Sequence, residues 1–211
     1  MHDDIGQCKS GYAGFSGVCV QLTKRQEKMS DEIAPPPGVK AGPKSRTDLF
    51  AYLDGLGVIH RTVDHPAIFT VEEGRDFKRD MPGGHSKNLF LKDKKGALTL
   101  AVAYSETQVD LVGLGKAIGA KGRLSFGKPE LMTATLGVIP GAVTPFALFN
   151  DRAKDLAQVV LDTRLLAHDP VWFHPLENTA STAVSPNDLV AFVESCGFQP
   201  QIRDLAAPQE G

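Results

Sequence analysis

The chain has 211 residues, of which 42% are hydrophobic and 23% charged, and its formal net charge is −2 at pH 7. This composition is typical of a globular protein with one sizeable core, and it excludes a protein that attracts nucleic acid through a strongly basic overall field. Three irregularly spaced cysteines argue against a disulfide framework, and no apolar run is long enough to span a membrane. We therefore expect a cytoplasmic protein that binds neither membranes nor DNA.

The charge is distributed unevenly along the chain. Residues 81–129 carry eight basic and three acidic side chains, a local net charge of +5, which leaves −7 on the rest. A basic segment in an acidic protein can bind a polyanion, whereas the alternative is a solvated face without a partner. Taken alone, the charge pattern favours the solvated face.

Residues 1–46 differ from the remainder in composition, because they are rich in Gly, Ser, Lys and Pro and contain three consecutive prolines. This predicts a disordered or loosely attached tail. Met29 starts a stretch typical of a native N-terminus, so translation could begin at Met1 or at Met29. Regular patterning predicts one domain over 47–205 and a short C-terminal tail over 206–211.

The predicted elements mix single helices with hairpins. In chain order, the patterns predict a helix over 47–53, a strand over 58–63, a helix over 70–80, a hairpin with strands 88–91 and 97–104, a helix over 111–118, a strand over 123–126, a helix over 129–136, a strand over 143–149, an apolar run over 156–161, strands over 171–174 and 179–184, and a helix over 185–197. Residues 201–205 form either a closing strand or a tail. Because helices and strands do not alternate regularly, we predict one α/β domain with a mixed, mostly antiparallel sheet and surrounding helices.

Common catalytic motifs are missing from the sequence. It contains no GxxxxGK[ST] phosphate loop and no GxSxG nucleophile elbow. The six histidines lack HExxH or comparable spacing, and no cysteine is close to one in the sequence. We therefore expect neither a metal nor another cofactor.

Three local features remain as candidates for chemistry. Gly83–Asn88 reads as a flexible loop leading into a buried strand, with Lys87 at the mouth of that strand and the rim of the sheet. A lysine there can hold a phosphate or a developing anion, and the alternative is an exposed strand-end lysine. Gly137–Pro145 contains two glycines and two prolines, so it forms either an ordinary turn or a stiff loop whose backbone N–H groups bind an oxyanion. His174 ends a predicted strand before Pro175, where it either orients a water or has a structural role.

These segments together resemble the YbaK/ProX superfamily of aminoacyl-tRNA deacylases, and they are most similar to its freestanding alanine-editing branch, ProXp-ala or PrdX. Four stretches carry the resemblance: Thr70–Glu73 after His65-Pro66, Gly83–Asp93, Leu136–Phe146, and Phe173–Asn178. Each stretch alone is weak, but their order and joint presence are specific. The resemblance extends over about residues 49–205.

The resemblance implies a single mixed α/β domain that hydrolyses the ester between a wrong amino acid and the tRNA 3′ end without a metal. The implied substrate of the branch is alanine on proline tRNA. The implied catalytic residues are Lys87, Asn88, Gly141 and His174. The implied substrate-binding residues are Ile68, Ala142, Val143, Thr144 and Pro145, with Gly141–Pro145 as the family's GxxxP loop.

The mechanism that we expect follows from this resemblance. Water attacks directly, backbone N–H groups around Gly141 and Ala142 stabilise the oxyanion, and Lys87 holds the terminal nucleotide or its phosphate. The helix predicted over 70–80 carries Arg75, Lys78 and Arg79, which we expect to contact the acceptor stem. The implied partners are the acceptor end of proline tRNA and prolyl-tRNA synthetase.

Three alternatives stay open at this point. The chain could deacylate another small amino acid such as cysteine or serine, it could be a non-catalytic module that binds tRNA or a nucleotide, or it could be a structural partner of a synthetase. A panel of mischarged tRNAs separates the first alternative from alanine editing. Loss of deacylation in a Lys87→Ala variant separates an enzyme from a binding module.

Overall fold

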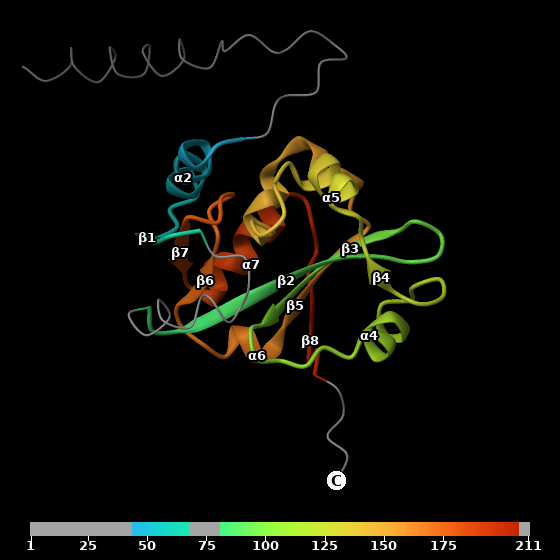
Figure 1. Ribbon diagram of the computed structural model, residues 1–211. Coiled ribbons are helices and arrows are strands. Elements are labelled where there is room, and N and C mark those ends of the chain that lie inside the picture. The colour runs from blue at the N-terminus through green and yellow to red at the C-terminus, as the bar shows by residue number, and fades with distance from the viewer. Residues whose placement is uncertain (1–43, 68–80, 207–211) are drawn as a thin grey trace, which may run out of the picture. The chain divides into compact units, whose positions relative to one another are not determined.

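The computed structural model of the chain describes residues 44–67 and 81–206 (Figure 1). The helix predicted over 70–80 lies outside the described residues, and so do the expected site residues Ile68, Arg75, Lys78 and Arg79. Most of the predicted N-terminal and C-terminal tails also lies outside them, so the domain boundaries stay predictions. Across the described ranges, no helix has the length and apolar composition needed to cross a membrane.

Helices and strands alternate irregularly along the described chain. The helical segments are α2 (Arg46–Gly55), α4 (Leu111–Ala117), α5 (Pro129–Leu136), the 3₁₀ segments η1 (Pro145–Phe149) and η2 (Asp151–Asp155), α6 (Thr163–Leu166) and α7 (Pro186–Ser195). The strands are β1 (Arg61–Asp64), β2 (Gly84–Lys92), β3 (Leu98–Tyr104), β4 (Ser125–Phe126), β5 (Gln158–Asp162), β6 (Val171–Phe173), β7 (Ala180–Val184) and β8 (Gln201–Arg203). The segment 201–205, which the sequence left open, therefore contains a strand.

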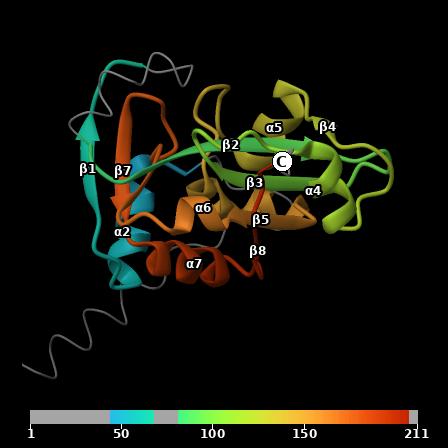
Figure 2. The ribbon, with the colours of Figure 1, turned by 90° about the horizontal axis from the view of Figure 1, so that it is seen from below.

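The strands form one mixed sheet in the order β1-β7-β6-β2-β3-β5-β8, and β4 pairs separately with β2. The β1–β7, β6–β7, β2–β3 and β2–β4 pairs are antiparallel, whereas β2–β6, β3–β5 and β5–β8 are parallel. This confirms the predicted mixed α/β class. Figure 2 shows that the long strand β2 runs from the β1–β7 side of the sheet to the part formed by β3 and β5.

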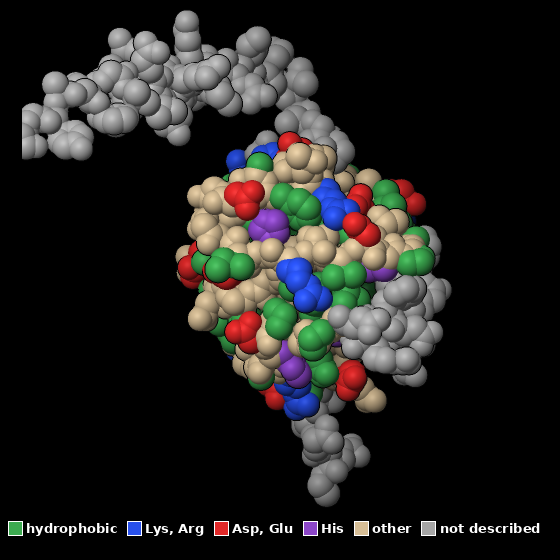
Figure 3. Space-filling model, turned by 90° about the vertical axis from the view of Figure 1, so that its left-hand side faces the viewer, with side chains coloured by type: hydrophobic (Ala, Val, Ile, Leu, Met, Phe, Trp, Pro, Cys, Tyr) green, Lys and Arg blue, Asp and Glu red, His purple; other side chains and the backbone are tan. Residues whose placement is uncertain are grey.

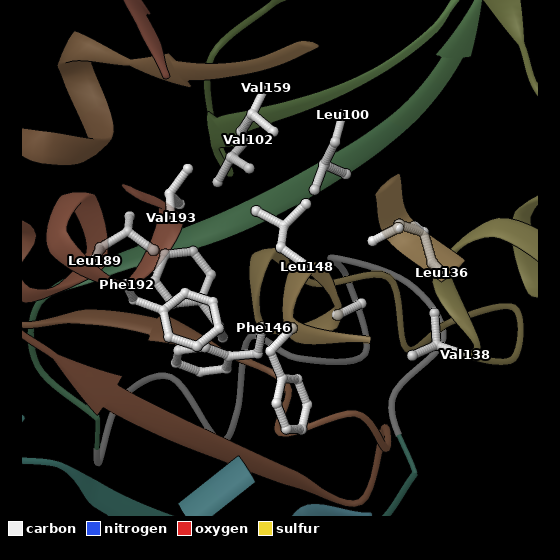
Figure 4. Close-up of a cluster of buried hydrophobic side chains, with 14 of the residues drawn as sticks. Leu100, Val102, Leu136, Val138, Phe146, Leu148, Val159, Leu189, Phe192 and Val193 are labelled. Atoms are coloured by element: carbon white, nitrogen blue, oxygen red, sulfur yellow. The ribbon is translucent and has the colours of Figure 1, made fainter. Parts of the chain in front are cut away.

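Packing on the two faces of this sheet produces two main hydrophobic clusters. The larger one joins the side chains of Leu100 and Val102 in β3 to Phe146 of η1 and Phe192 of α7 (Figure 4). The Phe146 and Phe192 rings meet edge to face, with centroids 5.3 Å apart. The second cluster packs Leu91, Ala101 and other alternate residues of β2 and β3 against Leu114 of α4 on the opposite face.

Two sequence predictions are wrong in this region of the fold. Residues 143–149 do not form a strand, because residues from Pro145 onward turn into the 3₁₀ segment η1, whose side chains are all buried. Pro145 fixes φ and lacks an N–H, and the Thr144 hydroxyl accepts a hydrogen bond from the Phe146 N–H (3.3 Å), which favours a helical start over a strand. A run of buried apolar residues does not distinguish the two structures.

The second error concerns Gly83–Asn88, which is strand from Gly84 onward instead of a flexible loop. Gly83 alone makes the turn, since its φ is +123° and a Cβ there would overlap the Pro170 carbonyl. Lys87 therefore lies inside β2, opposite Ala103 of β3, and not at the mouth of the strand.

Candidate functional site

One edge of β2 loses its strand partner in the middle of the sheet. On this edge β6 pairs with Gly84 and His85, and β4 pairs with Leu91 and Lys92, while β3 pairs along the opposite edge from Ser86 to Lys92. Among the described residues, no strand pairs with residues 86–90 on this side. The sheet therefore has a gap along β2, and we call this stretch the open edge.

The backbone of β2 directs polar groups into this gap. The Ser105 N–H donates to the His85 carbonyl (2.7 Å), so odd-numbered residues of β2 use their backbone groups to pair with β3. Because antiparallel pairing alternates, Ser86 and Asn88 direct their backbone groups toward the open edge. The Gly127 N–H donates to the Phe90 carbonyl from that same side (2.8 Å), in agreement with this alternation.

Asn88 connects the open edge to the Gly137–Pro145 loop. Its Nδ2 donates to the Val143 carbonyl (2.8 Å) and, more weakly, to the Ser86 hydroxyl (3.4 Å). The Asn88 Oδ1 is buried and has no hydrogen-bond partner within the described ranges. A buried acceptor without a partner costs free energy, so this oxygen is a candidate for accepting a hydrogen bond from a substrate.

The loop itself takes its shape from its glycines. Gly137 ends α5 in the left-handed conformation (φ +72°), and Gly141 is also left-handed (φ +88°). The Ala142 N–H donates to the Ile139 carbonyl (3.0 Å), so it is not available to an oxyanion, contrary to our expectation. The N–H groups of Gly141 and Val143 form no hydrogen bond with any described residue. Thr144 is fully buried, and it caps η1.

His174 is the first residue after β6, whereas the sequence predicted it as the last residue of that strand. Its Nδ1 contacts the Ala180 carbonyl (2.8 Å), which can only accept, so Nδ1 carries the proton. Burial lowers the pKa of His174, the nearby His65 lowers it further, and the bond to Ala180 opposes both. The neutral ring therefore presents Nε2 as an acceptor.

His65 enters the sequence only as part of the resemblance, yet its ring centroid lies 5.9 Å from that of His174. The His65 Nε2 contacts the Ser181 hydroxyl (2.9 Å), and its Nδ1 contacts the Pro66 carbonyl (2.8 Å). In the sequence, a single histidine before a proline does not indicate that its ring lies next to His174. His65 comes close to His174 because β1 pairs with β7, and in this pair Asp64 lies opposite Ala180.

Lys87 and Asn88 point to opposite faces of the sheet. Alternation places Lys87 on the face of Leu91 and α4, whereas Asn88 shares the face of Phe90 and η1. His85 of β2 and Trp172 of β6 are the last residues that these two parallel strands pair. Lys87 lies two residues beyond His85, and His174 lies two residues beyond Trp172, so the two occupy corresponding positions. The open edge is thus where groups from both faces come together.

The charge that acts on Lys87 belongs to Asp162, an acidic residue that the sequence did not single out. Burial lowers the pKa of Lys87, while the carboxylate of Asp162 raises it. Asp162 is fully buried, and it accepts hydrogen bonds from the Thr107 hydroxyl (2.8 Å) and the Tyr104 N–H (3.1 Å). A single acid directly after an apolar run gives no sign in the sequence of such a position.

The surface near β1 and β7 carries several kinds of side chain. Figure 3 views the molecule from that side, and histidine side chains reach the surface there beside hydrophobic and basic ones. In the part of the chain that the structure describes, no three His, Cys, Asp or Glu side chains are grouped closely enough to hold a metal ion.

Comparison with known proteins identifies the class to which this fold and site belong. Residues 65–192 match the aminoacyl-tRNA editing domain family. The chain is 38% identical over 166 residues to a prolyl-tRNA synthetase associated domain-containing protein 1 from Mus musculus, covering 77% of this chain and 97% of that one. It is 33% identical over 150 residues to the prolyl-tRNA editing protein ProX of Acetoanaerobium sticklandii, covering 71% and 90%.

A solved structure supports the fold. It is that of a protein proposed as a trans-editing enzyme for prolyl-tRNA synthetase, and it matches with a TM-score of 0.61 at 21% identity, covering 80% of this chain and all of that one. The class is therefore that of the aminoacyl-tRNA deacylases, which are ester hydrolases. The chain belongs to the aminoacyl-tRNA editing domain family, and this confirms the resemblance found in the sequence.

Proposed function

We propose that this chain removes alanine from mischarged proline tRNA, in the cytoplasm and as a partner of prolyl-tRNA synthetase. The names of the relatives from Mus musculus and Acetoanaerobium sticklandii support proline tRNA as the substrate. The observation that carries the proposal is the hydrogen bond from the Asn88 Nδ2 to the Val143 carbonyl. It fastens the loop to the open edge, where, among the described residues, the N–H groups of Gly141 and Val143 and the Asn88 Oδ1 have no hydrogen-bond partner.

The loop supplies the stabilisation of the transition state. As water attacks the ester carbon, the carbonyl oxygen becomes an oxyanion that the N–H groups of Gly141 and Val143 bind. A donor of this kind typically contributes about 3 kcal/mol to the lowering of the barrier. The C–O bond to the ribose then breaks, a proton of the attacking water passes to the ribose oxygen, and alanine and the tRNA with its free 3′ hydroxyl leave. Ala142, whose N–H is occupied, contributes to the wall of the pocket with Thr144 and Pro145.

His174 and Lys87 act on the water and on the tRNA end. The neutral His174 ring accepts a hydrogen bond at Nε2 and orients the attacking water, because its Nδ1 proton is engaged by Ala180. Lys87 belongs to the open edge itself, and it binds the phosphate of the terminal nucleotide. Asn88 Oδ1 accepts a hydrogen bond from the amino group of the substrate.

Selectivity for alanine follows from the size of the amino acid. A pocket that fits a methyl side chain excludes the proline ring, whereas synthesis alone discriminates methylene-sized differences by only about 1–3 kcal/mol. Ile68 contributes to this pocket in our proposal, and Arg75, Lys78 and Arg79 contact the acceptor stem; all four lie outside the described residues.

The test is deacylation of a panel of purified aminoacyl-tRNAs. We expect the chain to hydrolyse Ala-tRNA(Pro) much faster than Pro-tRNA(Pro) or Ala-tRNA(Ala). Equal rates on all three would contradict the proposal, and faster hydrolysis of Ser-tRNA(Pro) or Cys-tRNA(Pro) would reassign the edited amino acid.

The role of the loop is tested by an Asn88→Ala variant. Without the bond to Val143 the loop loses its position, so we expect kcat to fall by about a hundredfold or more, as on removal of an oxyanion-hole donor. The matched control is Gln201→Ala, which removes a side-chain amide bond to Gln158 (2.7 Å) between β5 and β8. The control should keep wild-type activity. An active Asn88→Ala variant would refute the role of the loop.

A further inference from the structure

One end of the sheet carries a cluster of basic side chains that we call the basic tip. It comprises the β2–β3 turn, the loop before β4 and the residue preceding α5. Its basic side chains are Lys92, Lys94, Lys95, Lys121, Arg123 and Lys128, of which Lys92 is half-buried and the others are exposed. Figures 1 and 2 both place the β2–β3 turn and the loop before β4 at the same end of the molecule. The basic segment noted in the sequence is therefore largely gathered in space.

A buried carboxylate holds the basic tip together. The Asp93 Oδ1 accepts hydrogen bonds from the Lys95 N–H (2.8 Å) and the Ala97 N–H (3.0 Å), and its Oδ2 accepts one from the Lys121 N–H (2.8 Å). The Lys94 N–H also donates to the Lys121 carbonyl (3.0 Å). These backbone donors, that of Lys121 first, lower the pKa of Asp93. The turn and the loop are thus fixed relative to each other.

Among the described residues, no carboxylate forms an ion pair with a cation of the basic tip. Asp93 directs its oxygens to backbone N–H groups, and none of the six basic side chains forms an ion pair within the described portion of the chain. Glu130, in the first turn of α5, is the acidic residue that follows Lys128 most closely in sequence. The tip is therefore a positive surface on a chain whose net charge is −2.

An aromatic ring lies beside the basic tip. The side chain of Phe126 in β4 is 64% exposed, although Phe126 pairs with Leu91 of β2. Residues opposite each other in an antiparallel pair share a face, so Phe126 lies on the face of Leu91 and, by alternation, of Lys87. Leu91 lies four positions after Lys87 along β2, which is a distance of about 14 Å. An exposed ring between cations is a platform on which a base can stack.

We propose that Phe126 and the basic tip form the docking surface for the acceptor arm of the tRNA. A base of the single-stranded end stacks on Phe126, and the phosphates of the adjoining stem bind the basic tip. This proposal rests on the proposed function, which brings the 3′ ester to the open edge at Lys87 and Asn88. Charge complementarity identifies the occupant as a polyanion, and the stacking ring indicates a polyanion with accessible bases.

Stacking is tested by measuring the affinity for uncharged proline tRNA. We expect Phe126→Ala to weaken binding about tenfold, because stacking on an aromatic ring contributes about 1–3 kcal/mol per base. Phe126→Tyr keeps the aromatic face and should bind within about twofold of wild type. Because the ring is mostly exposed, thermal unfolding should change little in either variant. Equal affinities of Phe126→Ala and wild type would overturn the stacking contact.

The phosphate contacts are tested by the dependence of affinity on salt. A variant with Lys94→Gln, Lys121→Gln and Arg123→Gln removes three cations while their backbone bonds stay in place. The slope of log affinity against log salt should decrease by roughly two to three, and binding at about 0.1 M salt should weaken more than tenfold. The control is Arg203→Gln, which removes one exposed cation from the edge strand β8.

Two outcomes separate this proposal from the proposed function. An unchanged slope in the triple variant, or a wild-type chain that does not bind tRNA, would overturn the docking surface. A wild-type chain that binds tRNA through the tip but leaves every aminoacyl ester intact would overturn the proposed function alone. If both proposals hold, the triple variant raises KM for Ala-tRNA(Pro) and keeps kcat, because the tip lies away from the ester.

Discussion

At the scale of single residues, the neighbours of His174 determine its chemistry. The carbonyl of Ala180 fixes the proton on Nδ1, and burial together with His65 keeps the ring neutral by lowering its pKa. The unfolded chain has no such neighbours, so its histidine binds a proton at a higher pH. The folded protein therefore loses stability as the pH falls through the ordinary pKa of histidine toward the lowered one.

This gives a pH-dependent prediction for a variant at this position. We expect the free energy of unfolding of the wild-type chain, measured in urea, to be lower at about pH 5.5 than at about pH 7.5. The His174→Gln variant keeps a donor for the Ala180 carbonyl. In this variant the free energy of unfolding should differ less between the two pH values. Identical differences in both proteins would show that His174 titrates normally in the folded state.

Lys87 and Asn88 illustrate a second point at this scale. They are adjacent in the sequence, yet one faces the second hydrophobic cluster and Asp162 while the other faces η1 and the loop. Sequence motifs place such residues together, whereas a strand sends them to opposite sides. In the proposed function both act on one substrate, which requires the gap that β6 and β4 leave along β2.

At the scale of elements, capping determines where the first described helix begins. Ser45 accepts a hydrogen bond from the Asp48 N–H (3.2 Å), and Asp48 Oδ2 accepts one from the Ser45 N–H (2.7 Å), which completes a capping box. The next residue, Arg46, contacts the carboxylates of Asp64 in β1 (2.6 Å) and of Glu177 (3.1 Å), three residues after His174. Ser45 and Arg46, which composition assigned to the N-terminal tail, therefore connect α2 to β1 and to the segment that follows His174.

We predict from this arrangement that Ser45→Ala destabilises the protein by about 1 kcal/mol, since an N-cap hydroxyl typically contributes that much. Urea denaturation followed by far-UV circular dichroism measures the change. Ser45→Asp retains a capping acceptor and should restore most of the loss. A fully stable Ser45→Ala variant would mean that Ser45 caps the helix without contributing to stability.

At the scale of the whole molecule, Asp162 links segments that are distant in sequence. Its carboxylate accepts hydrogen bonds from the Tyr104 N–H at the end of β3 and from the Thr107 hydroxyl beyond it. It also accepts bonds from the Arg164 N–H of α6 (3.1 Å) and, at 3.5 Å, from the Leu205 N–H near the C-terminal end. Every one of these donors would lack a partner if the carboxylate were removed.

We therefore expect Asp162→Ala to destabilise the protein by about 3 kcal/mol or more, because several buried donors become unsatisfied at once. The comparison variant is Thr107→Val, which removes one donor and leaves the carboxylate, and which should cost about 1 kcal/mol. Thermal and urea unfolding measure both effects. Similar small losses in the two variants would show that water replaces the carboxylate.

The sequence by itself determined the class of fold, most helices and strands, and the positions of His174 and the glycine-proline loop. Local signals carry these features: helix caps, turn glycines, and apolar spacing with period 3.6 or 2. The same signals failed for residues 143–149 and for Gly84–Lys87, where packing on a core and pairing with another strand override local pattern.

Only the tertiary structure decided which groups meet at the open edge. The gap between β6 and β4, the bond from Asn88 to Val143, the His65–His174 contact and the buried Asp162 all depend on pairing between strands far apart in the chain. Which backbone N–H groups find a partner is also a tertiary property: the Ile139 carbonyl occupies the N–H of Ala142, whereas no described residue accepts from the N–H of Gly141 or Val143. Contacts of this kind arise from chain topology, and no periodic pattern in a single sequence encodes them.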